Sequence, residues 1–185
     1  MQRYALTSAA AVLLLAGCIP VSLHPVYTEE TLVDVPELLG KWSDDPEEGY
    51  WLFEKEENVG EYRVTIQEKK EVRLVFRAHT ALTQENLLLD MVVEYPDKSE
   101  LEFYTVPVHL FWQIDTSGDQ LKMRTIDYQW LTDRDKKGRL WIKHETVDDR
   151  LVFTASPERM QRFVRHWVKC DEAWSDWEEL PRIKE

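Results

Sequence analysis

The sequence is poor in cysteine and has no apolar run long enough to cross a membrane. A permanent transmembrane helix needs about 20 consecutive apolar residues, whereas the main apolar stretch covers only residues 9–16. That stretch is typical of an export signal rather than of a permanent anchor. The 185 residues include two cysteines, Cys18 and Cys170. If Cys18 is chemically modified, Cys170 has no partner within the chain, and we expect it to be buried as a small apolar side chain.

Catalytic motifs are also missing. The chain has no Gly-x-Ser-x-Gly elbow, no phosphate-binding glycine-rich loop and no Cys-x-x-Cys pair. His144-Glu145 begins like a zinc-protease motif but lacks the second histidine, and residues 133–138 begin like a calcium loop but place Lys137 where an oxygen ligand is needed. We therefore expect no enzyme activity, no cofactor and no metal site.

Cations are scarce relative to anions. The chain has 23 Lys and Arg against 35 Asp and Glu, a formal net charge of −12. A body with this charge repels nucleic acid and anionic lipid head groups. We expect no nucleic-acid partner.

The N-terminus carries the most specific motif. One cation, Arg3, precedes the apolar stretch, which ends in Leu15-Ala16-Gly17-Cys18. These four residues resemble the lipobox of bacterial lipoproteins. The resemblance implies a signal peptide over residues 1–17, cleavage before Cys18, and attachment of diacylglycerol and palmitate-like acyl chains to that cysteine.

Such a lipidated cysteine implies a location in the bacterial cell envelope. Each buried CH₂ contributes about 0.8 kcal/mol, so several acyl chains hold a protein stably on a membrane. The residue after Cys18 is Ile19 rather than Asp, which by resemblance to the enterobacterial sorting pattern favours the outer membrane.

The remaining 168 residues suit one domain. Residues 18–36 contain three prolines and no sustained periodicity, so we expect a lipidated N-terminus and an extended tether that could span up to about 50 Å. The folded domain is expected over residues 37–185.

Within that domain the main signal is an alternation of apolar and polar residues, as in Tyr62, Val64 and Ile66. Alternation of this kind predicts half-buried strands, and short turns between them predict antiparallel pairing. About eight strands are expected, at residues 50–54, 62–66, 72–78, 87–95, 109–115, 120–127, 140–144 and 151–154. Residues 128–137 are expected to form a short helix or a long loop.

The periodicity changes after the last strand. Apolar residues then recur with helical spacing, and they are Met160, Phe163, Val164, Trp167 and Val168. This spacing predicts an α-helix over about residues 156–170, with its apolar stripe packed on the sheet.

Gly40-Lys41-Trp42, after a short turn-forming segment, resembles the opening of lipocalins. The resemblance implies an antiparallel lipocalin-like β-barrel, or a strongly curved sheet, of about eight strands with a helix after the last one. It also implies a ligand pocket, with Trp42 closing one end of the barrel and Arg150 roughly at the position of the closing arginine.

Two functions follow as hypotheses. The first is a non-enzymatic lipoprotein that binds a small apolar or amphipathic ligand, and its candidate ligand-binding residues are Arg73, Arg77, His79, Trp51, Trp112 and Trp141. The second is an assembly or scaffolding subunit that contacts another envelope protein. Its candidate contacts are Trp174 and Trp177, which we expect to be exposed in an acidic tail.

Overall fold

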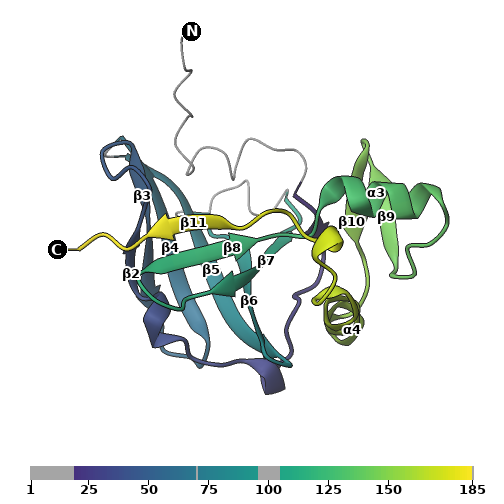
Figure 1. Ribbon diagram of the computed structural model, residues 1–185, viewed down its shortest axis with the longest axis horizontal. Coiled ribbons are helices and arrows are strands. Elements are labelled where there is room, and N and C mark those ends of the chain that lie inside the picture. Colours follow the sequence, from purple (N-terminus) through teal and green to yellow (C-terminus); the bar gives the residue numbers. More distant parts are fainter. Residues whose placement is uncertain (1–18, 70, 96–104, 185) are drawn as a thin grey trace, which may run out of the picture.

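The computed structural model describes residues 19–69, 71–95 and 105–184 (Figure 1). The predicted signal peptide and Cys18 lie outside these residues. The described chain is mainly β, as predicted, with one 11-stranded sheet and two α-helices. The strands are β1 (Val21–Ser22), β2 (Gly40–Trp42), β3 (Gly49–Lys55), β4 (Glu61–Glu68), β5 (Glu71–Thr83), β6 (Asn86–Val93), β7 (His109–Asp115), β8 (Gln120–Arg124), β9 (His144–Val147), β10 (Arg150–Phe153) and β11 (Glu178–Pro181). The α-helices are α3 (Tyr128–Lys136) and α4 (Pro157–Trp167), and the short 3-10 helices are η1 (Glu29–Thr31), η2 (Pro36–Leu38) and η3 (Asp171–Ala173).

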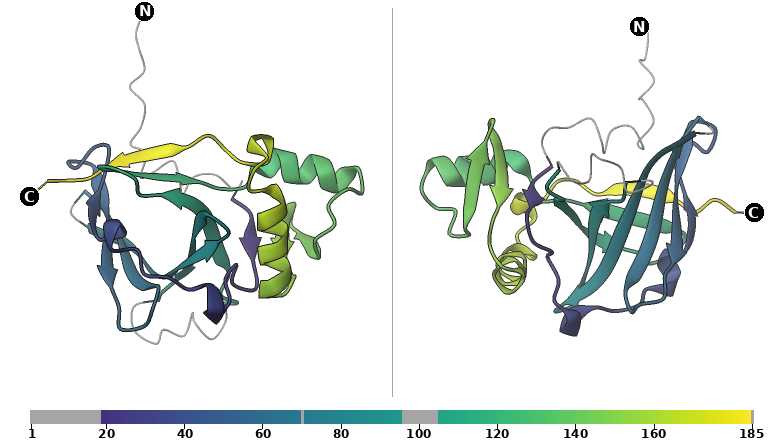
Figure 2. Two further views of the ribbon diagram at one scale, coloured as in Figure 1. Left: turned by 60° about the horizontal axis from the view of Figure 1, so that its bottom comes forward. Right: turned by 180° about the vertical axis from the view of Figure 1, so that it is seen from behind.

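The strands from β3 to β8 form the predicted antiparallel meander, which β2 extends at one end, and β11 pairs with β8. The expected number of about eight strands is too low, because β1, β2 and β11 were not expected. Figure 2 shows in its left view that these strands curl around a common interior. The sheet forks at β7, because Gln113–Asp115 pair with β8 whereas His109–Leu110 pair with β1. The second branch continues from β1 to β10 and β9.

The strand pairing does not close this sheet into a barrel. Its path begins at β2 and ends at β9, and among the described residues no ladder joins the two. The nearest approach to closure is an isolated bridge between Trp42 and Arg182 beside a hydrogen bond from the Ser43 N–H to the Pro181 carbonyl at 3.0 Å. Of the two expected alternatives, the closed barrel is therefore wrong, and the strands instead form a curved sheet that forks at β7 (Figure 2).

The sheet has a buried apolar core on each of its two sides. The inner core lies inside the curl of the sheet and includes Trp42, Trp51 and Trp112, and the outer core lies on the opposite side and includes Phe111, Phe153 and Phe163. Adjacent residues of β6 face opposite sides, so Leu89 lies in the inner core and Leu88 in the outer core. The outer core joins Leu88 and Phe111 of the sheet to the C-terminal lobe, which we define as residues 126–170. The apolar stripe of α4 packs there, which confirms the predicted C-terminal helix on the sheet.

The C-terminal lobe corrects one strand prediction. Residues 140–143 are not a strand, and β9 begins only at His144. The apolar side chain of Ile142, which suggested a strand, is instead buried in the outer core from an irregular segment. Of the short helix or long loop expected over residues 128–137, the structure has the helix, α3. The Asp127 carboxylate caps it by accepting the Trp130 N–H at 2.6 Å.

The N-terminal segment also differs from the expected tether. Val21–Ser22 form β1, the Val33 N–H donates to the Thr80 carbonyl at 3.1 Å, and Val26 is fully buried in the outer core. The described part of this segment, from Ile19 onward, is thus folded against the sheet. Its irregular path hides this from a search for periodicity.

Candidate functional site

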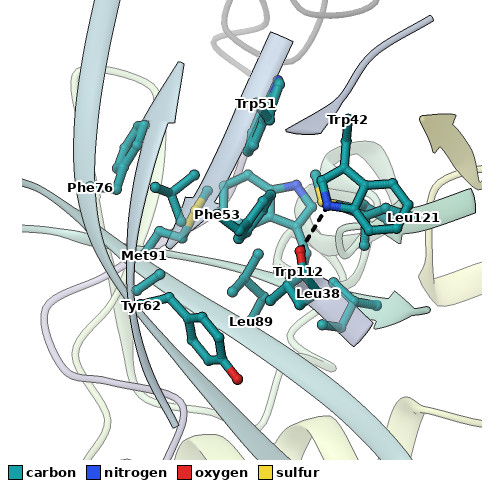
Figure 3. Packing of buried hydrophobic residues seen from close by; sticks show 14 of the residues in the cluster. Leu38, Trp42, Trp51, Phe53, Tyr62, Phe76, Leu89, Met91, Trp112 and Leu121 are labelled. Atoms are coloured by element: carbon teal, nitrogen blue, oxygen red, sulfur yellow. Dashed lines mark hydrogen bonds between the residues drawn. The ribbon is translucent and has the colours of Figure 1, made fainter. Parts of the chain in front are cut away.

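The inner core contains two of the tryptophans predicted to bind a ligand. Trp51 and Trp112 are buried and lie among closely packed side chains (Figure 3). The Nε1–H group of each ring has no hydrogen-bond partner among the described residues. Buried N–H donors are normally paired. These two rings therefore fill the interior of the curved sheet but leave two polar atoms unsatisfied.

The predicted basic candidates lie on the other side of β5. Arg77 and His79 alternate with inner-core residues, which places them on the outer face of the sheet. Arg73 is exposed beside a β-bulge and pairs with Glu68 at 3.5 Å. The structure therefore does not bring the predicted arginines and histidine together with Trp51 and Trp112.

His79 belongs to a different group of polar residues under the N-terminal segment. The Tyr27 ring stacks on the His79 ring at 4.6 Å between centroids. Asp90, which is 1% exposed, lies 2.6 Å from Nδ1 of His109 and accepts the Val26 N–H at 2.9 Å. Burial and the Asp90 carboxylate raise the pKa of Tyr27 to about 12, and burial lowers the pKa of His79. Asp90 thus fixes the N-terminal segment to the sheet.

Sequence reasoning missed Asp90 as an important residue. Its signal was a single carboxylate within the apolar run of residues 87–93. An acidic side chain is rarely fully buried unless it is paired. Such a residue in an otherwise apolar strand predicts a specific buried contact.

Trp141, the remaining ligand candidate, lies in the C-terminal lobe. It is 52% exposed and contacts His166 edge-on at 5.9 Å between ring centroids. His166 contacts Trp167 at 4.6 Å, and Trp167 contacts Trp130 at 4.8 Å. We call these four side chains the aromatic row. It joins α3, α4 and the segment before β9.

An arginine reinforces the aromatic row. The guanidinium carbon of Arg134 lies 4.3 Å from the centroid of the Trp167 ring and 4.9 Å from that of Trp130. Both distances are within the range of cation–π attraction. The Arg134 Nε and the Trp167 Nε1 are buried without a hydrogen-bond partner among the described residues. The row therefore runs from the exposed side chains of Trp141 and His166 to Trp167 and Trp130, which are partly buried against the outer core beside Arg134.

The charge of the C-terminal lobe is opposite to that of the rest of the chain. Residues 126–170 contain 10 Lys and Arg against 7 Asp and Glu, a net charge of +3. Residues 19–125 and 171–185 contain 12 Lys and Arg against 28 Asp and Glu, a net charge of −16. The exposed face of α4 carries Arg159, Arg162 and Arg165. The overall acidity of the chain hides this basic region.

The predicted partner residues Trp174 and Trp177 differ from each other. Trp174 is only 5% exposed, and its Nε1–H donates to the Trp167 carbonyl at 3.0 Å, so the expectation that it is exposed is wrong. Trp177 is 36% exposed. Arg124 lies 4.4 Å from the Trp177 ring and 5.4 Å from the Trp174 ring. The acidic tail thus folds back onto the sheet through a shared arginine.

The remaining predictions concern cysteine, metals and membrane spans. Cys170 is a free, half-buried thiol beside the outer core. Among the residues that the structure describes, no group of three or more His, Cys, Asp or Glu side chains could hold a metal ion. None of the helices in that part of the chain has the length and apolar character required to span a membrane.

Comparison with known proteins found no match. No family model fits the chain, and no curated protein or solved structure is significantly similar to it.

Proposed function

We propose that this chain is a lipid-anchored, non-enzymatic protein of the bacterial envelope, in the outer membrane, which binds another envelope protein through the aromatic row. The observation that carries the proposal is the row itself, with Trp141 half-exposed at one end and Arg134 stacked over two of its rings. Tryptophan and arginine are the residues most enriched among those that contribute strongly to protein binding. The lipobox supports the anchor.

Charge supports the nature of the partner. The row lies in the basic lobe, beside an acidic body, so an acidic surface on the partner would be attracted to the lobe and repelled by the rest of the chain. The packed inner core also favours an outer binding surface, because a ligand inside the sheet would have to displace close-packed side chains. We therefore place the partner contact on the C-terminal lobe.

Crosslinking in intact envelopes tests this proposal. The change is Trp141→Ala in the full-length lipoprotein, and the matched control is Trp177→Ala, which removes a partly exposed tryptophan outside the row. We expect Trp141→Ala to lower the yield of the crosslinked adduct at least about tenfold, equivalent to about 1.4 kcal/mol of binding. The control should retain the adduct.

The opposite pattern, with loss only in Trp177→Ala, would move the contact to the acidic tail. An adduct whose mass is twice that of the chain would show self-association instead of a distinct partner. Equal yields in all three proteins would contradict the proposal. Thermal unfolding of each variant checks that folding is unchanged.

A second candidate function, binding of a small amphipathic ligand, is supported by the two unpaired indole N–H groups. Trp51 and Trp112 could each donate to a carbonyl or carboxylate oxygen of a ligand that enters by displacing side chains of the inner core. Native mass spectrometry of the protein, isolated from envelopes in mild detergent, should then show a bound fatty acid or lipid. A Trp51→Phe, Trp112→Phe double variant removes both donors and should lose it. A ligand-free spectrum for the unmodified chain would exclude this candidate.

A further inference from the structure

The residues that directly follow Cys18 are held in the fold. Ile19 is partly buried against the inner core, Pro20 is buried, and Val21 begins β1. One peptide bond separates Cys18 from Ile19, and consecutive Cα atoms are about 3.8 Å apart. The chain therefore has no free segment between the expected site of acylation and the folded body.

The strand β1 is bonded along both of its edges. On one side Val21 pairs with Leu110 of β7 in antiparallel register, and on the other it pairs with Val152 of β10 in parallel register. The next residue, Leu23, donates its N–H to the Phe153 carbonyl at 2.9 Å. Ser22 is fully buried. This strand therefore connects β7 of the curved sheet to β10 of the C-terminal lobe.

We infer that the residues directly after the acylated cysteine are held in the fold, so that the body stays close to the lipid surface, with the start of β1 toward the membrane, in spite of the repulsion between its acidic residues and anionic head groups. The inference rests on the lipidation of Cys18 in the proposed function. A flexible tether over residues 18–36 would allow the body to rise up to about 50 Å above the membrane. Without a tether, its reach is set by the diameter of the body, which is on the order of 40 Å for a chain of this length. The partner must then lie in the same membrane or at its surface.

Protease release from the membrane tests the inference. A spacer variant carries an added isoleucine and about ten Gly and Ser residues between Cys18 and Ile19, so that the residue after Cys18 is unchanged. In membrane vesicles treated with a broad-specificity protease, the spacer variant should release a folded body at least about tenfold faster than the native chain, because local opening of β1 must precede cleavage of the native chain. The control places the same insert after Gly138, in an exposed turn. It should leave release from the membrane unchanged.

Equal release of the native chain and the spacer variant would overturn the inference. Amide hydrogen exchange of the native chain gives a second measure that does not depend on lipidation. Slow exchange at Val21 and Leu23, compared with an exposed amide such as that of Val59, supports the rigid attachment. Fast exchange at those two amides would also overturn it.

Failure of the lipidation itself gives a different result. In that case labelled palmitate would be absent from the native chain, and Cys18→Ser would stay with the membrane fraction as the native chain does. This outcome refutes the anchor, and with it the seating on the membrane, even if β1 is protected from exchange.

Discussion

Replacing Trp42 by alanine should lower the free energy of unfolding by about 4 kcal/mol, as measured by urea denaturation. The indole is fully buried in the inner core, and its Nε1–H donates to the Leu38 carbonyl at 2.8 Å. Removing a large aromatic side chain from a core costs about 3–5 kcal/mol, because the apolar contacts are lost and a cavity remains. The matched control is Trp141→Ala, since Trp141 is half-exposed. Its cost should stay below about 1 kcal/mol.

The Trp42 site also predicts a coupling with Arg182. The guanidinium carbon lies 4.0 Å from the centroid of the indole ring, and Nη1 donates to the Leu39 carbonyl at 2.6 Å. A double-mutant cycle of Trp42→Ala and Arg182→Ala should give a coupling energy of about 1 kcal/mol. Strict additivity of the two single effects would show that the stacked cation contributes nothing to the closure between β2 and the C-terminal end of the chain.

Replacing Asp90 by alanine should lower the free energy of unfolding by about 3 kcal/mol. The change leaves the buried Val26 N–H and the ring of His109 without the carboxylate that they contact. Removing one partner of a buried polar pair lowers the free energy of unfolding several times more than removing one partner of a solvent-exposed pair. The N-terminal segment should loosen first. Faster hydrogen exchange at the Val26 amide than at β3 amides would show this order.

Two variants control for the Asp90 result. Asp176→Ala removes an exposed carboxylate from the tail and should change stability by less than about 0.5 kcal/mol. Asp90→Asn keeps an oxygen acceptor of similar shape and should lose less stability than the alanine variant. An alanine variant as stable as the native chain would mean that Asp90 does not hold the N-terminal segment.

The strands and α4 could be predicted because their side-chain periodicities are regular. Tyr62, Val64 and Ile66 face the inner core, as their alternation indicated. The outer core could not be found in this way. Because β6 is apolar on both faces, alternation does not indicate which of its residues face inward. Continuous apolar character is itself a sign of a strand covered on both sides. The run of residues 87–93 therefore held information that a search for alternation does not use.

The candidate site was less accessible from sequence than the fold. The aromatic row joins three segments that only the packing of the lobe brings together, so no spacing along the chain predicts it. The arginine that packs on Trp42 is Arg182 and not Arg150, which lies in the β9–β10 hairpin. A two-residue strand such as β1 has no detectable period at all. In each case the controlling contacts are between residues far apart in sequence.

The position of β1 also constrains the order in which the elements of the chain can fold. Val21 emerges first, but its partner in β10 lies about 130 residues later. Its other partner, Leu110 of β7, lies about 90 residues later. The first strand of the described chain can therefore gain one neighbour midway through the sequence, but it is bonded along both edges only when β10 has formed.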